Sequence, residues 1–164
     1  FDFINRLNGH KVIMKGNHDY WWNSMAKMNR FLEENGFDTI TIVHNNYYPY
    51  GEYGICGTRG WIKDTEEPAD AKVLSREAGR LETSIKAALA DGKKPIVFLH
   101  YPPIFANDYN REILDVLFQY DIKTCYYGHL HGNAHRYAVC GEVDGINYQL
   151  IAGDFVQFCP KFIM

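Results

Sequence analysis

The sequence predicts a mixed α/β domain. Short apolar runs alternate with segments whose apolar residues recur at helical spacing, and several of the apolar runs end in glycine, histidine or asparagine. At 164 residues, with 46% hydrophobic and 23% charged residues, the chain has the composition of a globular protein with one sizeable core. No repeat or linker-like tract divides it, so we expect a single domain over residues 1–164.

The N-terminal part of the chain predicts short elements on either side of a glycine loop. In order they are the end of a helix over residues 1–7, a strand over 11–15, a helix over 24–35, a strand over 39–43 and a hairpin over 47–57. Ser24 is a favourable N-cap residue and Gly36 a favourable helix stop. The run 39–43 is rich in β-branched residues, which favour strands.

The C-terminal part predicts longer helices between buried strands. In order the elements are a helix over residues 71–91, a strand over 95–99, a helix over 111–120, a strand over 124–127 and a hairpin over 136–151. Gly92 ends the first helix, and Asp144-Gly145 is a strong hairpin signal. The acidic run 64–70 contains Pro68, so we expect a loop there that covers a site.

Polar motifs follow three of the predicted strands. Gly16-Asn17-His18-Asp19 comes after the first strand, His100 after the run 95–99, and Gly128-His129-Leu130-His131 after the run 124–127. In an open α/β sheet the ends of the strands line a common crevice, so we expect these side chains to converge. Asparagine oxygen and imidazole nitrogen are metal ligands, and histidine also transfers protons.

These three motifs, in this order, resemble those of the calcineurin-like metallophosphoesterases. The resemblance implies a four-layer α-β-β-α sandwich and hydrolysis of a small phosphoester by a metal-activated water between two divalent ions, which can be Mn, Fe, Zn or Co. It assigns one ion to Asn17, His100 and His129 and the other to His131. It also implies that His18 and Asp19 are catalytic, with His18 protonating the leaving oxygen or binding the phosphoryl group and Asp19 holding its imidazole.

Two further motifs of that family are absent from this sequence. They are an Asp-x-His at the end of the first strand and a Gly-Asp-x-x-Asp at the end of the second. The resemblance therefore implies a partial, N-terminally truncated sandwich that lacks its first strands, taken from a longer dinuclear hydrolase. We expect the chain alone to bind at most one metal ion, because His131 is the one ligand left for the second, and to turn over little substrate.

Other residues have a plainer interpretation. Arg59, just after the hairpin, is a candidate for binding a phosphate oxygen, although a surface role is as compatible with its position. His10, His44 and His135 are interpreted as surface or core histidines, and Asp154 as a turn residue or a support for the site.

Charge and cysteine content limit the alternatives. A net charge of -3 without long basic runs argues against general nucleic-acid binding, and no apolar stretch is long enough for a membrane span. The four cysteines lack a disulfide-like or C-x-x-C spacing, which favours a reducing compartment such as the cytoplasm.

Two other functions stay open: a non-catalytic metal-binding or protein-interaction remnant of the fold, and a nuclease of the same superfamily, which would need a basic groove. Nothing in the sequence indicates which oligomeric state the protein adopts.

Overall fold

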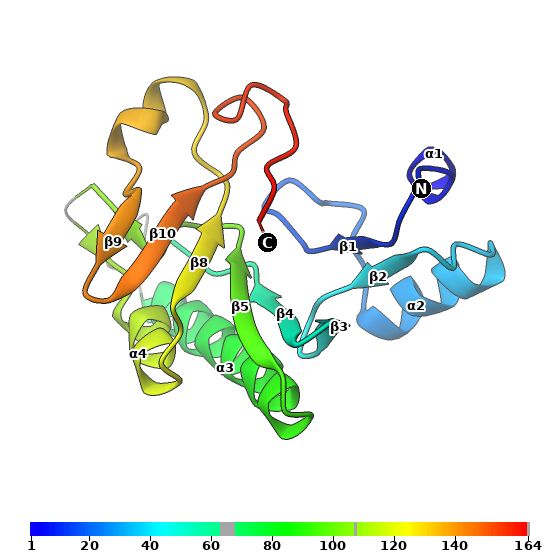
Figure 1. Ribbon diagram of the computed structural model, residues 1–164, viewed down its shortest axis with the longest axis horizontal. Coiled ribbons are helices and arrows are strands. Elements are labelled where there is room, and N and C mark those ends of the chain that lie inside the picture. The colour runs from blue at the N-terminus through cyan, green and yellow to red at the C-terminus, as the bar shows by residue number, and fades with distance from the viewer. Residues whose placement is uncertain (63–67, 107, 164) are drawn as a thin grey trace.

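The computed structural model describes residues 1–62, 68–106 and 108–163 and contains two main sheets flanked by helices (Figure 1). The mixed α/β class is therefore confirmed. In chain order the elements are α1 (Asp2–Asn5), β1 (Lys11–Ile13), α2 (Met25–Glu34), β2 (Ile40–Ile42), β3 (Tyr47–Tyr50), β4 (Tyr53–Thr58), α3 (Pro68–Ala90), β5 (Lys94–Leu99), β6 (Ile104–Phe105), β7 (Asp108–Tyr109), α4 (Arg111–Gln119), β8 (Thr124–Tyr127), the 3₁₀ helix η1 (Gly132–Tyr137), β9 (Gly141–Val143) and β10 (Ile146–Leu150).

The larger sheet has six strands in the order β3-β4-β5-β8-β10-β9. The four central strands are parallel, and the edge strands β3 and β9 pair antiparallel with their neighbours through tight hairpins. All four central strands consequently end at the same edge of the sheet. This edge is where ligands bind in open α/β sheets.

Helices α3 and α4 cover one face of this sheet (Figure 1). The apolar stripe of α3 includes Leu81, Ile85 and Ala88, which are fully buried against the strands. Cys56 and Cys125 lie in strands and are buried as free thiols, as expected for core cysteines. Within the described ranges, none of the helices combines the length and the apolar character needed to cross a membrane.

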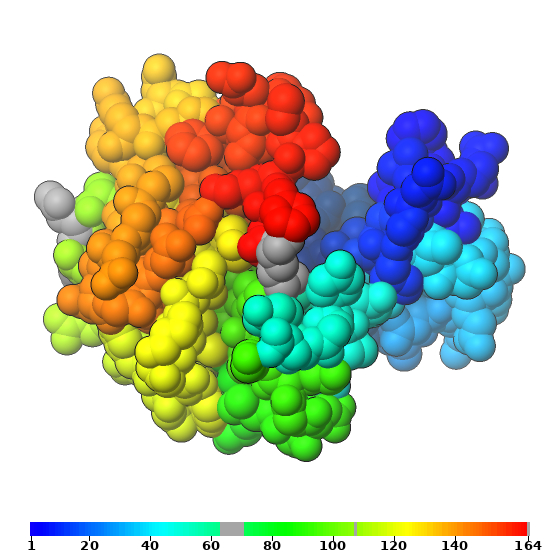
Figure 2. All heavy atoms as spheres, in the orientation of Figure 1, coloured from blue at the N-terminus to red at the C-terminus, as the bar shows by residue number. Residues whose placement is uncertain are grey.

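The first part of the chain forms a smaller unit. Strands β1 and β2 make a two-stranded parallel sheet, and Met28 and Leu32 of α2 pack on Ile40 and Ile42 of β2. This four-residue buried cluster is separate from the main core. In Figure 2 the unit is the blue lobe to one side of the main body.

The two sheets approach each other closely where Met14 faces Gly57. A cavity of about 490 Å³ between them is lined by β1 on one side and by β4 and β5 on the other. At one end of it the Met14 sulfur lies so close to Gly57 of β4 that a Cβ there would be 2.9 Å away. The layers therefore run from α2 through the small sheet and the large sheet to α3 and α4.

Several expected elements differ in extent. Residues 136–140 are not part of the last hairpin: they belong to η1 and to the link before β9, because the Asp154 carboxylate accepts a hydrogen bond from the Gly132 N–H (2.9 Å) and anchors a turn there. Ser24 is at the N-cap of α2, yet its side chain makes no capping hydrogen bond. Of the loop expected over 64–70, residues 68–70 start α3, and the rest lies outside the described residues.

Candidate metal centre

Three side chains from distant parts of the chain meet at the carboxyl ends of the strands. The Nε2 atom of His100, just after β5, lies 2.7 Å from Oδ1 of Asn17 and 3.2 Å from Nδ1 of His129. Asn17 follows β1, and His129 follows β8. The structure therefore brings together the three residues that the sequence assigned to one ion. Their role as ligands stays a prediction.

The donor atoms of this cluster have the spacing of metal ligands. Two atoms that bind one ion at about 2.1 Å and at right angles to each other are about 3 Å apart. The observed separations of 2.7 and 3.2 Å are of this size. The described residues contain no group of three or more His, Cys, Asp or Glu side chains arranged to hold a metal, and the predicted set of ligands includes the amide of Asn17.

The environment of His100 keeps its imidazole neutral. Burial, followed by repulsion from His129, lowers the pKa of His100 to about 4; Arg59 and His131 also lower it, whereas Asp19 raises it. A neutral imidazole keeps a lone pair for a metal ion, because the competing proton is already disfavoured. Tyr101 packs edge-on against His100, with ring centroids 5.0 Å apart, and shields one side of the cluster.

We expect this low pKa to make the metal-free chain less stable in mild acid. The unfolded chain takes up a proton on His100 near its ordinary pKa of about 6.5, whereas the folded chain does so only near 4. The unfolded state thus binds more protons in this window, and stability falls as the pH drops from about 6.5 to about 4. Urea unfolding at several pH values should show a shallower pH dependence for His100→Asn; an unchanged slope would contradict this assignment.

The backbone at His129 is strained. Its φ angle is 70°, in the left-handed region that non-glycine residues rarely adopt, and the Leu130 N–H closes the turn onto the Gly128 carbonyl at 2.8 Å. Such strain costs about 1–3 kcal/mol and clusters at functional sites. His129 itself, and not the preceding Gly128, takes the unusual conformation.

The loop of residues 16–19 differs from its expected geometry. Asp19 was predicted to hold the imidazole of His18, but its carboxylate accepts a hydrogen bond from the Gly16 N–H (2.6 Å) and so closes the loop. His18 is exposed, and its Nδ1 lies 3.2 Å from the hydroxyl of Tyr20. Tyr20 was not singled out from the sequence, since a tyrosine after a loop has no distinguishing pattern.

His131 takes a different partner from the cluster. Its Nδ1 lies 2.8 Å from Oδ1 of Asp154, whose other oxygen accepts the Gly132 N–H. The pKa of the Asp154 carboxyl is held well below its usual range by the Gly132 N–H and then by His131. His135 Nε2 also lies 3.2 Å from Asp154, without hydrogen-bond geometry. A carboxylate on Nδ1 orients the ring and leaves Nε2 available to a metal, which matches the supporting role considered for Asp154.

We expect Asp154→Ala to release His131 and loosen the turn of η1. The substitution removes the carboxylate's hydrogen bonds to His131 and to the N–H groups of Gly132 and Phe155, so the free energy of unfolding should fall. It should also shift the His131 tautomer away from the Nδ1–H form. Chemical denaturation measures the first effect and ¹⁵N NMR of the imidazole the second. Equal tautomer populations in both proteins would argue against Asp154 as the orienting group.

Arg59 lies at the end of β4, beside the cluster. Its guanidinium is 3.8 Å from the carboxylate of Glu77 and sits over the Trp61 ring, 4.8 Å from the ring centre. Glu77 is fully buried and also pairs with Arg80 at 2.6 Å and with the Thr58 hydroxyl at 2.6 Å. Sequence reasoning missed Glu77, although a carboxylate within the apolar stripe of α3 was a usable signal.

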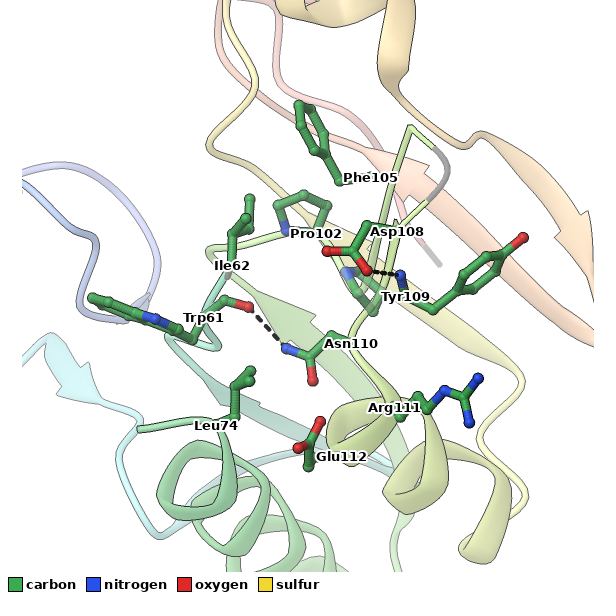
Figure 3. Close-up of a pocket in the computed structure, with 11 residues that line it drawn as sticks. Trp61, Ile62, Leu74, Pro102, Phe105, Asp108, Tyr109, Asn110, Arg111 and Glu112 are labelled. Carbon is green, nitrogen blue, oxygen red and sulfur yellow. Dashed lines mark hydrogen bonds between the residues drawn. The ribbon is translucent and has the colours of Figure 1, made fainter. Parts of the chain in front are cut away.

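A pocket lies beside Trp61 and the loop that follows His100. It has a volume of about 230 Å³, and its walls include Trp61, Pro102 and Asn110. Figure 3 shows the Asn110 amide donating to the Trp61 carbonyl (2.8 Å), a bond that ties two loops together at the pocket rim. The Trp61 ring at the pocket wall packs on Tyr101, and Tyr101 packs in turn on His129. The Tyr101 side chain therefore connects the pocket wall with the histidine cluster.

Comparison with known proteins gives one family. The model of the calcineurin-like phosphoesterases matches residues 1–133, a range that contains all three motifs. Searches of curated proteins and of solved structures return no match. The family in general binds divalent metals and hydrolyses phosphoesters. Since the match covers most of the 164 residues, this chain belongs to the calcineurin-like phosphoesterase family.

Proposed function

We propose that this chain provides the histidine-rich part of a metal-dependent phosphoester hydrolase centre. The observation that carries the proposal is that His100 Nε2 lies 2.7 Å from Asn17 Oδ1 and 3.2 Å from His129 Nδ1 at the carboxyl ends of the strands. The two separations match the distance between neighbouring ligands of one ion, and the low pKa of His100 leaves its imidazole neutral, as a metal ligand has to be. The family to which the chain belongs supports the same reaction class.

The proposed ligands divide into two sets. Asn17, His100 and His129 hold one divalent ion, and His131, oriented by Asp154, contributes to a second. When bound, such ions lower the pKa of a water nucleophile and stabilise charge on the phosphoryl oxygens. A single neutral imidazole is a poor site for a dication, so we propose that this chain alone holds at most one ion and that a carboxylate bridge is needed for two.

Two further residues act on the substrate in this proposal. His18 is exposed and its Nδ1 contacts the Tyr20 hydroxyl, so its imidazole can turn towards a leaving oxygen and donate a proton. Asp19 positions His18 by closing the loop through Gly16 and not by direct contact. Arg59 is held near Glu77 but faces the same end of the sheet, where its guanidinium can bind a phosphoryl oxygen.

The test measures metal content and hydrolysis together. The chain is loaded with Mn²⁺, its stoichiometry is measured, and p-nitrophenyl phosphate hydrolysis is compared with that of a form extended upstream and of Asn17→Ala. We expect up to one ion in the 164-residue chain, clearly weaker binding in Asn17→Ala, and substantial turnover only in the extended form. Equal metal binding by the wild type and Asn17→Ala, with no turnover in either length, would leave the non-catalytic remnant as the better description.

A further inference from the structure

A second cavity, of about 540 Å³, lies beside the candidate metal centre. It is formed between the segment around Lys15 and the start of α2 on one side and α3 on the other. Among the side chains that line it are Arg59, Arg76 and Arg80. We call it the basic cavity. It is distinct from the pocket behind Trp61 shown in Figure 3, with which it shares no lining residue.

The described residues that line the basic cavity carry an excess of positive charge. Lys15, Arg59, Arg76 and Arg80 are cationic, and the one carboxylate is that of Glu77. Because Arg59 and Arg80 share this single carboxylate, and Lys15 and Arg76 form no ion pair with other described residues, three positive charges stay uncompensated. This excess is unusual in a chain whose net charge is -3.

Glu77 fixes the geometry of the cations instead of neutralising them. Its side chain is fully buried and is held by the Thr58 hydroxyl at 2.6 Å, so the Arg80 guanidinium, also 2.6 Å away, has a rigid support. His44 faces the cavity as well. Burial and then the charge of Arg80 lower the pKa of His44, so it is a neutral hydrogen-bonding group at pH 7. A cationic wall on a rigid support is suited to a multiply charged anion.

The start of α2 adds backbone donors to the same cavity. Ser24 and Met25 both line it, the Ser24 side chain makes no capping hydrogen bond, and the first turn contains no acidic residue. The first N–H groups of a helix lack intrahelical partners, and this end of the helix dipole is positive. Anions bind readily at such ends when cationic side chains are also present.

The basic cavity is contiguous with the candidate metal centre. Lys15 directly precedes Gly16, whose Cα lies so close to His100 that a Cβ would be 3.2 Å from the imidazole. On the other side, the Arg59 carbonyl accepts the Tyr101 N–H at 2.9 Å, next to His100. The basic cavity and the histidine cluster are therefore neighbours along two stretches of the chain.

We propose that the basic cavity binds a second phosphoryl group of the substrate, so that the substrate is a small phosphoanhydride such as inorganic pyrophosphate or a nucleoside diphosphate. This inference rests on the proposed function. Hydrolysis consumes one water: its oxygen bonds to the phosphorus held at the histidine cluster, and the P–O bond to the bridging oxygen breaks. The bridging oxygen leaves with the phosphoryl group in the basic cavity, and the protons of the water are shared between the two products or released to solvent.

The test separates binding in the basic cavity from catalysis. Inorganic pyrophosphate and inorganic phosphate are titrated by calorimetry into the full chain after removal of metal. We expect pyrophosphate to bind at least about 10-fold more tightly than phosphate, and Arg76→Ala to weaken pyrophosphate binding by about 10-fold, the usual size of one charge-assisted hydrogen bond. Arg30→Ala is the matched control, because Arg30 is an exposed arginine of α2 that does not line the cavity.

Each outcome supports or overturns one claim. Equal affinity for pyrophosphate and phosphate, or equal effects of Arg76→Ala and Arg30→Ala, would overturn the second phosphoryl site even if the protein hydrolyses p-nitrophenyl phosphate. Tight pyrophosphate binding without hydrolysis of any phosphoester in the Mn²⁺-loaded extended form would overturn the proposed function and leave an anion site. Tighter binding of a single-stranded oligonucleotide than of pyrophosphate would overturn the small-molecule class.

Discussion

Replacing His100 by alanine is expected to weaken Mn²⁺ binding by about 100-fold or more. Removal of a group that merely orients a ligand costs about 10–100-fold in metal affinity, and loss of a central ligand should exceed that. His100 is central because its Nε2 is in contact with both Asn17 and His129. Calorimetry with Mn²⁺ at pH 7.5 measures the affinity directly and does not require turnover.

The control for this experiment is another histidine substitution. His10→Ala removes an exposed imidazole that contacts the Thr41 hydroxyl, away from the cluster, so it should leave Mn²⁺ affinity within about twofold, since it removes no donor atom of the site. Circular dichroism establishes that both variants are folded. If folded His100→Ala binds Mn²⁺ as the wild type does, the metal centre is elsewhere.

Gly57→Ala is expected to destabilise the protein by about 3 kcal/mol or more. A Cβ at this position in β4 would lie 2.4 Å from the backbone oxygen of Phe98 in β5 and 2.9 Å from the sulfur of Met14. The methionine can move, but the carbonyl belongs to a central parallel strand pair and cannot move without breaking the sheet. Urea unfolding followed by tryptophan fluorescence should show the loss.

The matched glycine for comparison is Gly79 in α3. A Cβ there meets no atom within 4 Å, so Gly79→Ala should stabilise the helix by about 1 kcal/mol through the better helix propensity of alanine. The two substitutions add the same methyl group and should act in opposite directions. Similar unfolding midpoints for both variants would show that the two strands have room to separate.

Much of the fold was predictable from local signals. Gly36 and Gly92 end α2 and α3 with positive φ angles of 65° and 69°, and Asp144-Gly145 forms the turn between β9 and β10, also with positive φ at both residues. These signals are reliable because few other residues adopt such angles. The 3₁₀ turn of η1 was not predictable, since the residue that anchors it, Asp154, is more than twenty positions away in sequence.

The candidate metal ligands were predictable from the sequence, but the residues that hold them in place were not. Neighbouring parallel strands that end at one edge bring together His100 and His129, so this part of the site follows from strand order. Asn17 follows β1 of the small sheet, so its contact with His100 depends on how the two sheets pack. The partner of Asp19 depends on the backbone of the loop, which the residue types do not specify. In the sequence, Glu77 is one of several polar residues of a long helix. Its contacts with Arg59 and Arg80 are visible only in the tertiary structure.

The separation of the buried residues into two clusters has a dynamic consequence. The cluster formed by α2 and β2 is small, so residues 1–43 should open as a unit at a lower free energy than the six-stranded sheet, and their amides should exchange with deuterium first. Asn17 belongs to this unit, whereas His100 and His129 belong to the larger sheet. A metal ion bound by all three residues therefore links the N-terminal unit to the six-stranded sheet. The N-terminal unit can then open only after it releases the ion. Added metal should therefore slow amide exchange in α2 by a factor of about one plus the ratio of free metal concentration to its dissociation constant.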